Sequence, residues 1–393
     1  MRFQARFFPC LILALSLASV RSQAAHRSQG DQAFRAGDFA TAATAYASEH
    51  SQNPKDVQVL LRMGDLALFA DKLTEAERDY RGALAIDPTN KWATRSLTDI
   101  QRRRGSGDEF TVKDAGATAI VPFIATDPLP VIRVKLDGGR DANFLIDTGA
   151  PAVALDPSVA KELGLKIEDA GMGVFAGGLR APIRVATLGT ISCGQVSVDH
   201  VPVSVMPLEG APAPKGVHLD GILGTSFFYH FLATLDYSHG QLILAPRTTS
   251  AAFELSAQQR GDSSVPLWYV PDHFLFAQAR VNDGAVRLFN IDTGGEGMGL
   301  QATQDTVKDA HIVLDEAHKT RFSGGGGDVT TIPFHAAVTV GTTTVRDLPG
   351  QYFPDGDQYG IFPFEVGGTI SHEFFRHLAV TFDFTAMRMV LTR

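Results

Sequence analysis

The sequence predicts a multi-domain chain, with a short helical module followed by a larger all-β part that contains two copies of one unit. Three observations support this fold class. A helical pattern near the amino terminus repeats with a period of 34 residues, and after about residue 118 short apolar runs are broken by Gly and Pro. The tripeptide Asp-Thr-Gly follows an apolar run at Asp147 and returns behind a similar run at Asp292. At 393 residues the chain has the length of two or three domains.

Residues 1–24 have the pattern of a secretory signal peptide. Arg2 and Arg6 form a basic start, and the apolar stretch 7–20 is shorter than the roughly 20 residues of a membrane span. Residues 22–24 offer a cleavage site. We therefore expect an exported protein, in a periplasm or outside a bacterial cell, with no stable membrane span. An uncleaved membrane anchor is the alternative.

The net charge argues against a nucleic-acid-binding protein, and the cysteine content argues against a disulfide-bonded one. The formal net charge is −8, which is not the basic footprint of a nucleic-acid-binding protein, so we expect no such partner. Cys10 lies in the predicted signal peptide, and Cys193 would be alone in the mature chain, without a disulfide. We expect Cys193 to be a buried core thiol, because free cysteines are usually buried.

Residues 25–104 are predicted to be helical and repetitive. Tyr46 and Pro54 recur as Tyr80 and Pro88, 34 residues later, which is the period of tetratricopeptide repeats. The segment resembles a pair of such repeats, with residues 90–104 as a closing helix. The resemblance implies a groove for a protein partner. A helical brace without a partner is the other interpretation.

The remainder reads as two β units, 119–247 and 265–393, with a polar linker at 105–118 and a second linker at 248–264. The units align at an offset that stays between 144 and 147 residues. Ser226-Phe227-Phe228 in the first, for example, matches Glu373-Phe374-Phe375 in the second. A duplication explains this regularity.

The two Asp-Thr-Gly loops carry the predicted chemistry. Two carboxylates held about 3 Å apart cannot both ionise, so they share a proton. Asp147 and Asp292 could then activate a water molecule and protonate a carbonyl oxygen, without any metal or cofactor. Thr148 and Thr293 could each bond to the opposite loop. The glycine after each threonine leaves room for the approach.

With these loops, the stretch Gly221 to Phe228 and the strand Leu235-Asp236-Tyr237 resemble retropepsin-like aspartic peptidases. The resemblance implies two β-barrel lobes, arranged as in a bilobed pepsin-like protease, with Asp147 and Asp292 as the catalytic pair. The residues that it assigns to support of the active-site loops are Thr148, Gly149, Ala150, Thr293, Gly294, Gly295, Ile222, Leu223 and Gly224. Thr369-Ile370-Ser371 stands in the second unit where Ile222-Leu223-Gly224 stands in the first, so we expect a weaker brace for Asp292.

The family also covers its cleft with flexible β flaps. Candidates for flap or substrate contacts are Gly177 and Gly178 in the first unit and Gly324, Gly325 and Gly326 in the second. Ordinary surface loops are the alternative. Ala150 and Gly295 offer no hydroxyl to the carboxylates, so we expect the pair to titrate higher than in pepsin, with activity at mildly acidic to neutral pH.

His372 and His377 are five residues apart and would not share a helix face, so we expect a structural helix instead of a zinc site. The sequence thus predicts an exported aspartic endopeptidase that cleaves an extended peptide in the cleft between its lobes, as a monomer. One alternative is a catalytically inactive protein that binds peptides or envelope partners with the cleft and the repeats. The other is a scaffold in which the helical repeats carry the function.

Overall fold

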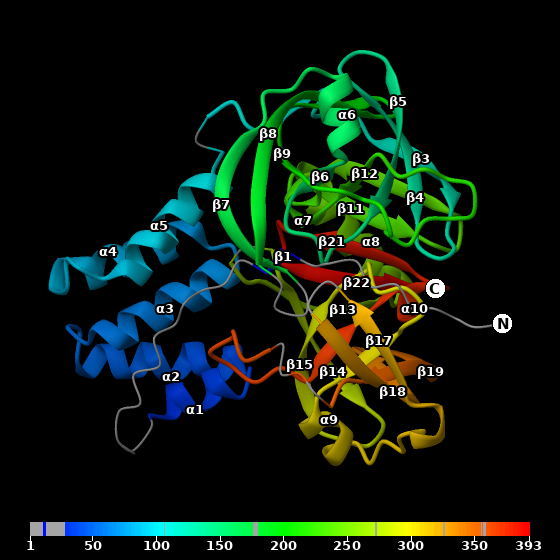
Figure 1. Ribbon diagram of the computed structural model, residues 1–393. Coiled ribbons are helices and arrows are strands. Elements are labelled where there is room, and N and C mark those ends of the chain that lie inside the picture. Colours follow the sequence, from blue (N-terminus) through cyan, green and yellow to red (C-terminus); the bar gives the residue numbers. More distant parts are fainter. Residues whose placement is uncertain are drawn as a thin grey trace.

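The computed structural model describes residues 11–12, 28–105, 107–175, 180–271, 273–324, 327–354, 356 and 359–393. Helices occupy the first part and a β-rich region follows (Figure 1). The predicted signal peptide lies outside the described residues except for β1 (Leu11–Ile12), which pairs with β7. No helix in the described ranges is both long and apolar enough to cross a membrane.

The helical region contains α1 (Gln29–Arg35), α2 (Phe39–Gln52), α3 (Val57–Phe69), α4 (Leu73–Ile86) and α5 (Lys91–Arg103). Each helix packs on the next along the chain. The 34-residue period is visible in the contacts, because Tyr46 donates a hydrogen bond to Asp31 at 2.8 Å and Tyr80 donates one to Asp65 at 2.7 Å. The same Tyr–Asp hydrogen bond therefore joins α1 to α2 and α3 to α4.

A sheet at the centre of the β part takes strands from both ends of it. Its strands are β3 (Ala119–Ala125), β12 (Gln241–Pro246), β11 (Phe231–Asp236), β21 (Ala379–Asp383), β22 (Arg388–Thr392) and β13 (Ser263–Tyr269), in that order and all antiparallel. At its middle Thr234 pairs with Thr381, and their hydroxyl oxygens are 2.7 Å apart. The order of the strands is therefore symmetric about this contact.

Each side of the central sheet carries a half with the same pairing pattern. The first half contains β4 (Val131–Leu136), β5 (Arg140–Ile146), β6 (Val153–Leu155), α6 (Pro157–Glu162), β7 (Glu168–Phe175), β8 (Arg180–Cys193), β9 (Val196–Val205), β10 (Gly221–Leu223) and α7 (Thr225–Phe228). The second half contains β14 (Leu275–Val281), β15 (Val286–Ile291), β16 (Leu300–Ala302), α9 (Gln304–Asp309), β17 (Thr320–Gly324), β18 (Gly327–Val340), β19 (Thr343–Tyr352), β20 (Gly368–Ile370) and α10 (His372–Phe375), with a short 3-10 turn at Glu316–His318.

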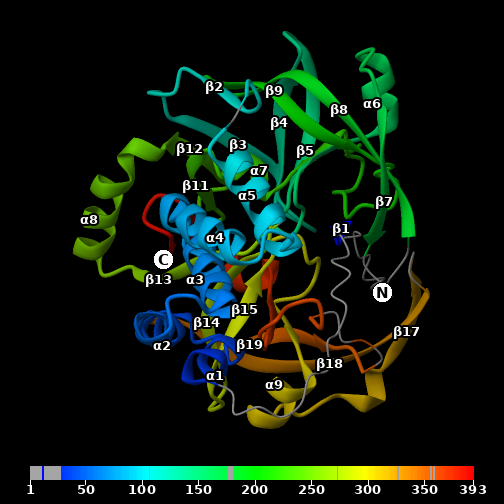
Figure 2. The ribbon, with the colours of Figure 1, turned by 90° about the vertical axis from the view of Figure 1, so that its left-hand side faces the viewer.

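The matching pairs include two parallel contacts in each half. β10 runs parallel to β5, and β20 runs parallel to β15. β6 likewise runs parallel to β9, and β16 to β19. The remaining strand pairs are antiparallel. In Figures 1 and 2 the first half (green) lies above the central sheet and the second (yellow to orange) below it.

Both segments predicted as linkers contain regular structure. Residues 105–118 include β2 (Thr111–Lys113), which adds to the first half beside β9. Residues 248–264 include the whole of α8 (Ser250–Arg260), after a 3-10 turn at Arg247–Thr249. These segments are polar because β2 and α8 leave part of their surface exposed.

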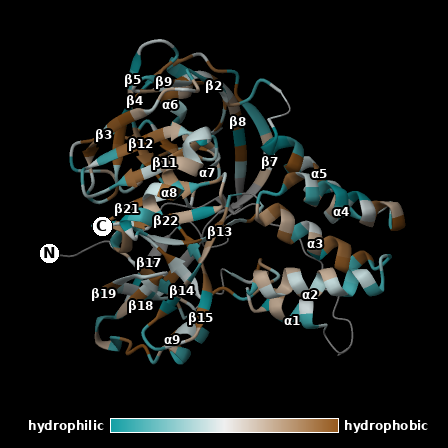
Figure 3. Ribbon diagram, turned by 180° about the vertical axis from the view of Figure 1, so that it is seen from behind, coloured by the Kyte–Doolittle hydropathy of each residue, from teal (hydrophilic) through white to brown (hydrophobic). Residues whose placement is uncertain are grey.

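The largest core fills both halves and the central sheet, and Cys193 lies in it, 1% exposed. Burial raises the pKa of the Cys193 thiol to about 12, so it is an inert core thiol. A second core joins the helices to the second half: Phe34 and Phe39 pack with Phe276 and Phe364. In Figure 3 the strands β3 and β12 carry hydrophobic stretches, and alternate residues of each strand face the core.

Candidate active site

The two Asp-Thr-Gly loops begin where two buried strands end. β5 ends at Ile146 and β15 at Ile291, so Asp147 and Asp292 are the first residues beyond them. The neighbouring parallel strands hold both aspartates by the backbone. Asp147 N donates to Leu223 O at 3.1 Å, and Asp292 N donates to Ile370 O at 3.0 Å.

The loops meet closely enough to bring the two carboxylates together. A Cβ on Gly149 would collide with the Asp292 carboxylate, and a Cβ on Gly294 would collide with the Asp147 carboxylate. Only glycine therefore fits at these two positions. Each glycine also donates its N–H to the aspartate two residues before it, at 2.7 Å to Asp147 and at 2.8 Å to Asp292.

Two threonines lock the loops to each other. Thr148 N donates to Thr293 Oγ1 at 3.1 Å, and Thr293 N donates to Thr148 Oγ1 at 3.0 Å. Thr148 Oγ1 in turn donates to Ile291 O at 3.2 Å. Both threonines are essentially inaccessible, at 1% and 0% exposure, so these bonds form without competition from water.

Burial and mutual repulsion shift the titration of the pair. The pKa of Asp147 is raised well above its usual range by burial and then by the Asp292 charge. Burial also raises the pKa of Asp292, while N–H donors from the glycine loops and a hydrogen bond with Asp147 oppose the rise. The pair therefore retains one proton to a higher pH than an isolated Asp would.

The brace of the second loop differs from the expectation of a weakened one. In the first half Gly224 has no room for a side chain, and Thr225 Oγ1 donates to Thr148 O at 2.7 Å. In the second half Ser371, which is fully buried, accepts from Gly295 N at 2.9 Å and donates to Asp292 O at 2.5 Å. The polar residue thus ties down the Asp292 loop directly. The expectation was wrong because it treated Ser371 as a lost contact.

Sequence reasoning missed two buried polar side chains near the pair. His273 is 1% exposed, and burial lowers the pKa of His273 to about 3, so the ring stays neutral over most of the pH range. Tyr237 is 7% exposed, and its pKa is raised first by burial and then by the charges of Asp147 and Asp292. The one available signal for His273 is its match to the apolar Leu129 in the first unit, which marks it as a polar residue at a core position.

The predicted flap residues can be placed only in part. Hairpins of β7 with β8 and of β17 with β18 occupy matching positions in the two halves. Gly324 is the last residue of β17. The other candidates, Gly177, Gly178, Gly325 and Gly326, lie outside the described residues.

The histidine pair near the carboxyl terminus does not form a metal site. His372 opens the short helix α10, is fully buried and packs edge-on against Tyr237, while burial lowers the pKa of His372 to about 4. Across the ranges that the structure describes, no group of three or more His, Cys, Asp or Glu side chains is arranged to hold a metal ion. Asp236 and Asp383 bind local groups: Asp236 accepts from His239 N at 3.0 Å and Asp383 from Thr385 N at 2.8 Å.

Comparison with known families finds a match in the first half. Residues 132–227 match the family model described as aspartyl protease. This segment is less than half of the chain. It includes the first Asp-Thr-Gly loop and most of the Gly221 to Phe228 stretch, and it stops before the second loop. The comparison with curated proteins finds no match to this chain at the sequence level.

Several solved structures show a weak overall likeness. The basic 7S globulin from soybean has a TM-score of 0.41 and 10% identity, with 72% of this chain and 95% of that chain covered. Conglutin gamma, a basic 7S globulin from lupine seeds, has a TM-score of 0.40 and 10% identity over 70% and 95%. An aspartic proteinase from Irpex lacteus has a TM-score of 0.40 and 12% identity over 70% and 97%. The sequence similarity to aspartyl proteases is thus limited to residues 132–227.

Proposed function

We propose that this protein is an exported aspartic endopeptidase that uses Asp147 and Asp292 as its catalytic pair. The observation that carries the proposal is the hydrogen-bonded contact between the Asp147 and Asp292 carboxyls, each delivered by its own Asp-Thr-Gly loop, with Asp147 buried and Asp292 partly exposed. Two acids in contact with one shared proton supply a base and an acid at one place, which is what addition of water to a peptide carbonyl requires.

In the mechanism that follows, the ionised carboxylate takes a proton from a water molecule held between the pair. The water oxygen adds to the scissile carbonyl carbon, and the protonated carboxyl donates to the carbonyl oxygen. A gem-diol intermediate results, and protonation of the amide nitrogen then releases the two products. No covalent intermediate forms on the protein. The raised pKa of Asp147 supplies the neutral acid at mildly acidic to neutral pH.

The substrate would be a peptide in extended form, bound between the halves by strand-like backbone hydrogen bonds. The hairpins β7–β8 and β17–β18 are the proposed flaps over it. Because both aspartates lie in one chain, a monomer suffices for catalysis.

The finer architecture supports this proposal. The two halves share their strand pairs, the same order of elements and the same position of the Asp loop, which favours descent from one duplicated retropepsin-like lobe. The helical region is proposed to be a tetratricopeptide pair with a closing helix. Gly30 faces Tyr46 with no room for a side chain, as Gly64 faces Tyr80 one period later.

The test uses purified full-length protein and a library of peptides. We expect cleavage that pepstatin inhibits and that both Asp147→Asn and Asp292→Asn abolish, with a rate maximum between mildly acidic and neutral pH. A maximum near pH 2 would contradict the proposed proton sharing. Peptide binding that neither substitution affects, without any cleavage, would favour the inactive binding protein instead.

A further inference from the structure

The two halves differ most clearly on one face of the strands that carry the aspartates. In the first half this face is apolar across three strands, where Leu145 pairs with Ile222 and Ile222 with Ala154. These residues are 0%, 1% and 4% exposed. Leu208 and Leu219, from the segment that follows β9, pack on the row and fill the space above it.

The matching positions of the second half are polar. Asn290 pairs with Thr369, and Thr369 pairs with Gln301, in the same registers. All three are buried, at 8%, 4% and 8% exposure. Thr369 is well bonded, since its hydroxyl lies 2.7 Å from Tyr359 Oη and 3.4 Å from Asn290 Nδ2. We name Asn290, Thr369 and Gln301 the polar row.

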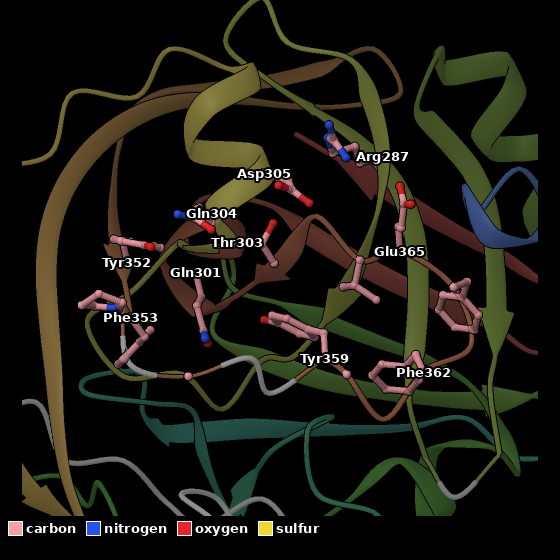
Figure 4. Close-up of a pocket in the computed structure, with 16 residues that line it drawn as sticks. Arg287, Gln301, Thr303, Gln304, Asp305, Tyr352, Phe353, Tyr359, Phe362 and Glu365 are labelled. Carbon is pink, nitrogen blue, oxygen red and sulfur yellow. The ribbon is translucent and has the colours of Figure 1, made fainter. Parts of the chain in front are cut away.

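A pocket of about 460 Å³ opens at the Gln301 end of this row, and Gln301 is the row residue that lines it. Gln301 lines it, with Tyr352 on one side and Tyr359 on the other (Figure 4). Gln301 is only 8% exposed, and its carboxamide lies among the side chains drawn around the pocket. A group that enters the pocket and covers this amide without a hydrogen bond to it would cost about 1–3 kcal/mol.

The polar row lies on the same sheet face as the catalytic pair. Side chains two residues apart on a strand point to the same face, so Asn290 leaves β15 on the side to which Asp292 continues. Leu145 and Asp147 have the same relation in the first half. A peptide that crosses the pair would therefore place a side chain toward the polar row, whereas Leu208 and Leu219 cover the apolar row.

We infer that the polar row and its pocket form a subsite that selects an Asn or Gln side chain of the substrate, on the second-half side of the scissile bond. This inference rests on the proposed function. A carboxamide matches Gln301 because each can donate and accept in one plane. An apolar side chain would leave Gln301 unpaired. The charged Arg287 also lines the pocket, but it lies 3.5 Å from Asp309, so its charge is already paired with a carboxylate.

The test compares pairs of peptides that are identical except for Gln or Leu at one position near the cleaved bond. We expect wild-type protein to prefer the Gln peptide by about ten- to hundredfold in kcat/KM at one position. Gln301→Leu should reverse the preference, and the isosteric Gln301→Glu should move it to a Lys peptide. Gln258→Leu, the same change on the exposed face of α8, serves as the control and should retain the wild-type ratio.

The inference and the proposed function fail in different ways. If no peptide is cleaved, the proposed function is wrong. The same peptide pairs are also titrated calorimetrically into the Asp147→Asn variant, which reads the preference without cleavage. If the Gln-to-Leu ratio is the same in wild-type protein, Gln301→Leu and Gln301→Glu, the proposed subsite is wrong, whether or not peptides are cleaved.

Discussion

Thr148 and Thr293 connect the stability of the molecule with the position of its acids. Each hydroxyl accepts the other loop's N–H, so the two loops cannot separate without leaving two buried N–H groups unpaired. A second threonine pair, Thr234 and Thr381, joins the same two halves at the central sheet, away from the carboxylates. The two pairs allow stability and activity to be tested separately.

We predict that Thr148→Val lowers the free energy of unfolding by about 1–3 kcal/mol, because Thr293 N loses its buried acceptor. It should also lower kcat at least about tenfold, since the acids lose their fixed separation. Urea denaturation and peptide hydrolysis measure the two effects. Thr234→Val, the control, should affect stability but not kcat. An equal loss of kcat in both variants would show that the threonine lock has no special role.

The carboxyl pair should make stability fall as pH rises. Because the folded-state pKa of Asp147 is raised, the folded protein holds its proton more tightly than the unfolded chain does. The full stability is therefore present below the usual Asp pKa of about 3.9 and declines as pH rises through the folded-state pKa. Asp147→Asn removes this penalty.

We predict that Asp147→Asn unfolds at a higher temperature than wild-type protein at neutral pH, and that the difference shrinks toward zero as pH falls to about 3.9. Asp292→Asn should behave in the same direction. Calorimetry across pH 3 to 8 checks both variants. A variant that is less stable than wild type at neutral pH would mean that the carboxylates attract the loop N–H groups more than they repel each other.

At the scale of elements, the two Asp loops are braced by complementary pairs of residues. The first half combines Ala150 with Gly224, and the second combines Gly295 with Ser371. Gly224 lies against the backbone oxygen of Ala150, and a Cβ on Gly295 would collide with Ser371 Oγ. Gly224 therefore excludes a side chain because backbone oxygens lie against it, and Gly295 excludes one because Ser371 fills that space.

This arrangement predicts strong coupling in a double-mutant cycle. Gly295→Ala alone should disrupt the Asp292 loop, and Ser371→Gly alone should remove the hydroxyl that binds Gly295 N and Asp292 O. The double variant, which reproduces the first-half pair, should recover part of the stability and kcat lost in Gly295→Ala. Additive losses, measured by urea denaturation and hydrolysis, would show that the two positions act independently.

The sequence alone could predict those features that depend on the repeat and on strand periodicity. The strands that end at Asp147 and Asp292 follow from the apolar run before each Asp-Thr-Gly, and the equivalence of β10 and β20 follows from the repeat. The Ser371 brace could not be predicted, because its partners are backbone atoms of another loop. The sequence predicts a linker where β2 lies, because a three-residue strand carries no sign of its pairing with β9. The Ser371 brace and the strand β2 both depend on partners that are distant in the sequence.

At the scale of the whole molecule, one buried charged cluster joins the helical region to both halves. Arg103 of α5 donates to Tyr269 O of the second half at 3.1 Å and lies over the Tyr269 ring at 4.0 Å. Asp71, between α3 and α4, lies 3.6 Å from Arg103 and accepts from Tyr229 of the first half at 3.0 Å. Arg247 lies 3.5 Å from Asp71. The contacts favour a role for the helices as a brace.

We predict that Arg103→Met destabilises the protein by about 3–5 kcal/mol, because Asp71 would keep its burial and lose one of its two cations. Burial already raises the pKa of Asp71, and Arg103 opposes this. In the variant that pKa should rise further, so the loss of stability should be larger at pH 8 than at pH 5.

Arg104→Met, which removes a solvent-exposed pair with Glu77, is the matched control and should change the unfolding midpoint little. Urea denaturation at the two pH values checks both variants. Equal, small effects would mean that the helices are attached mainly by the aromatic core around Phe39 and Phe364, and that the charged cluster is not needed for the brace.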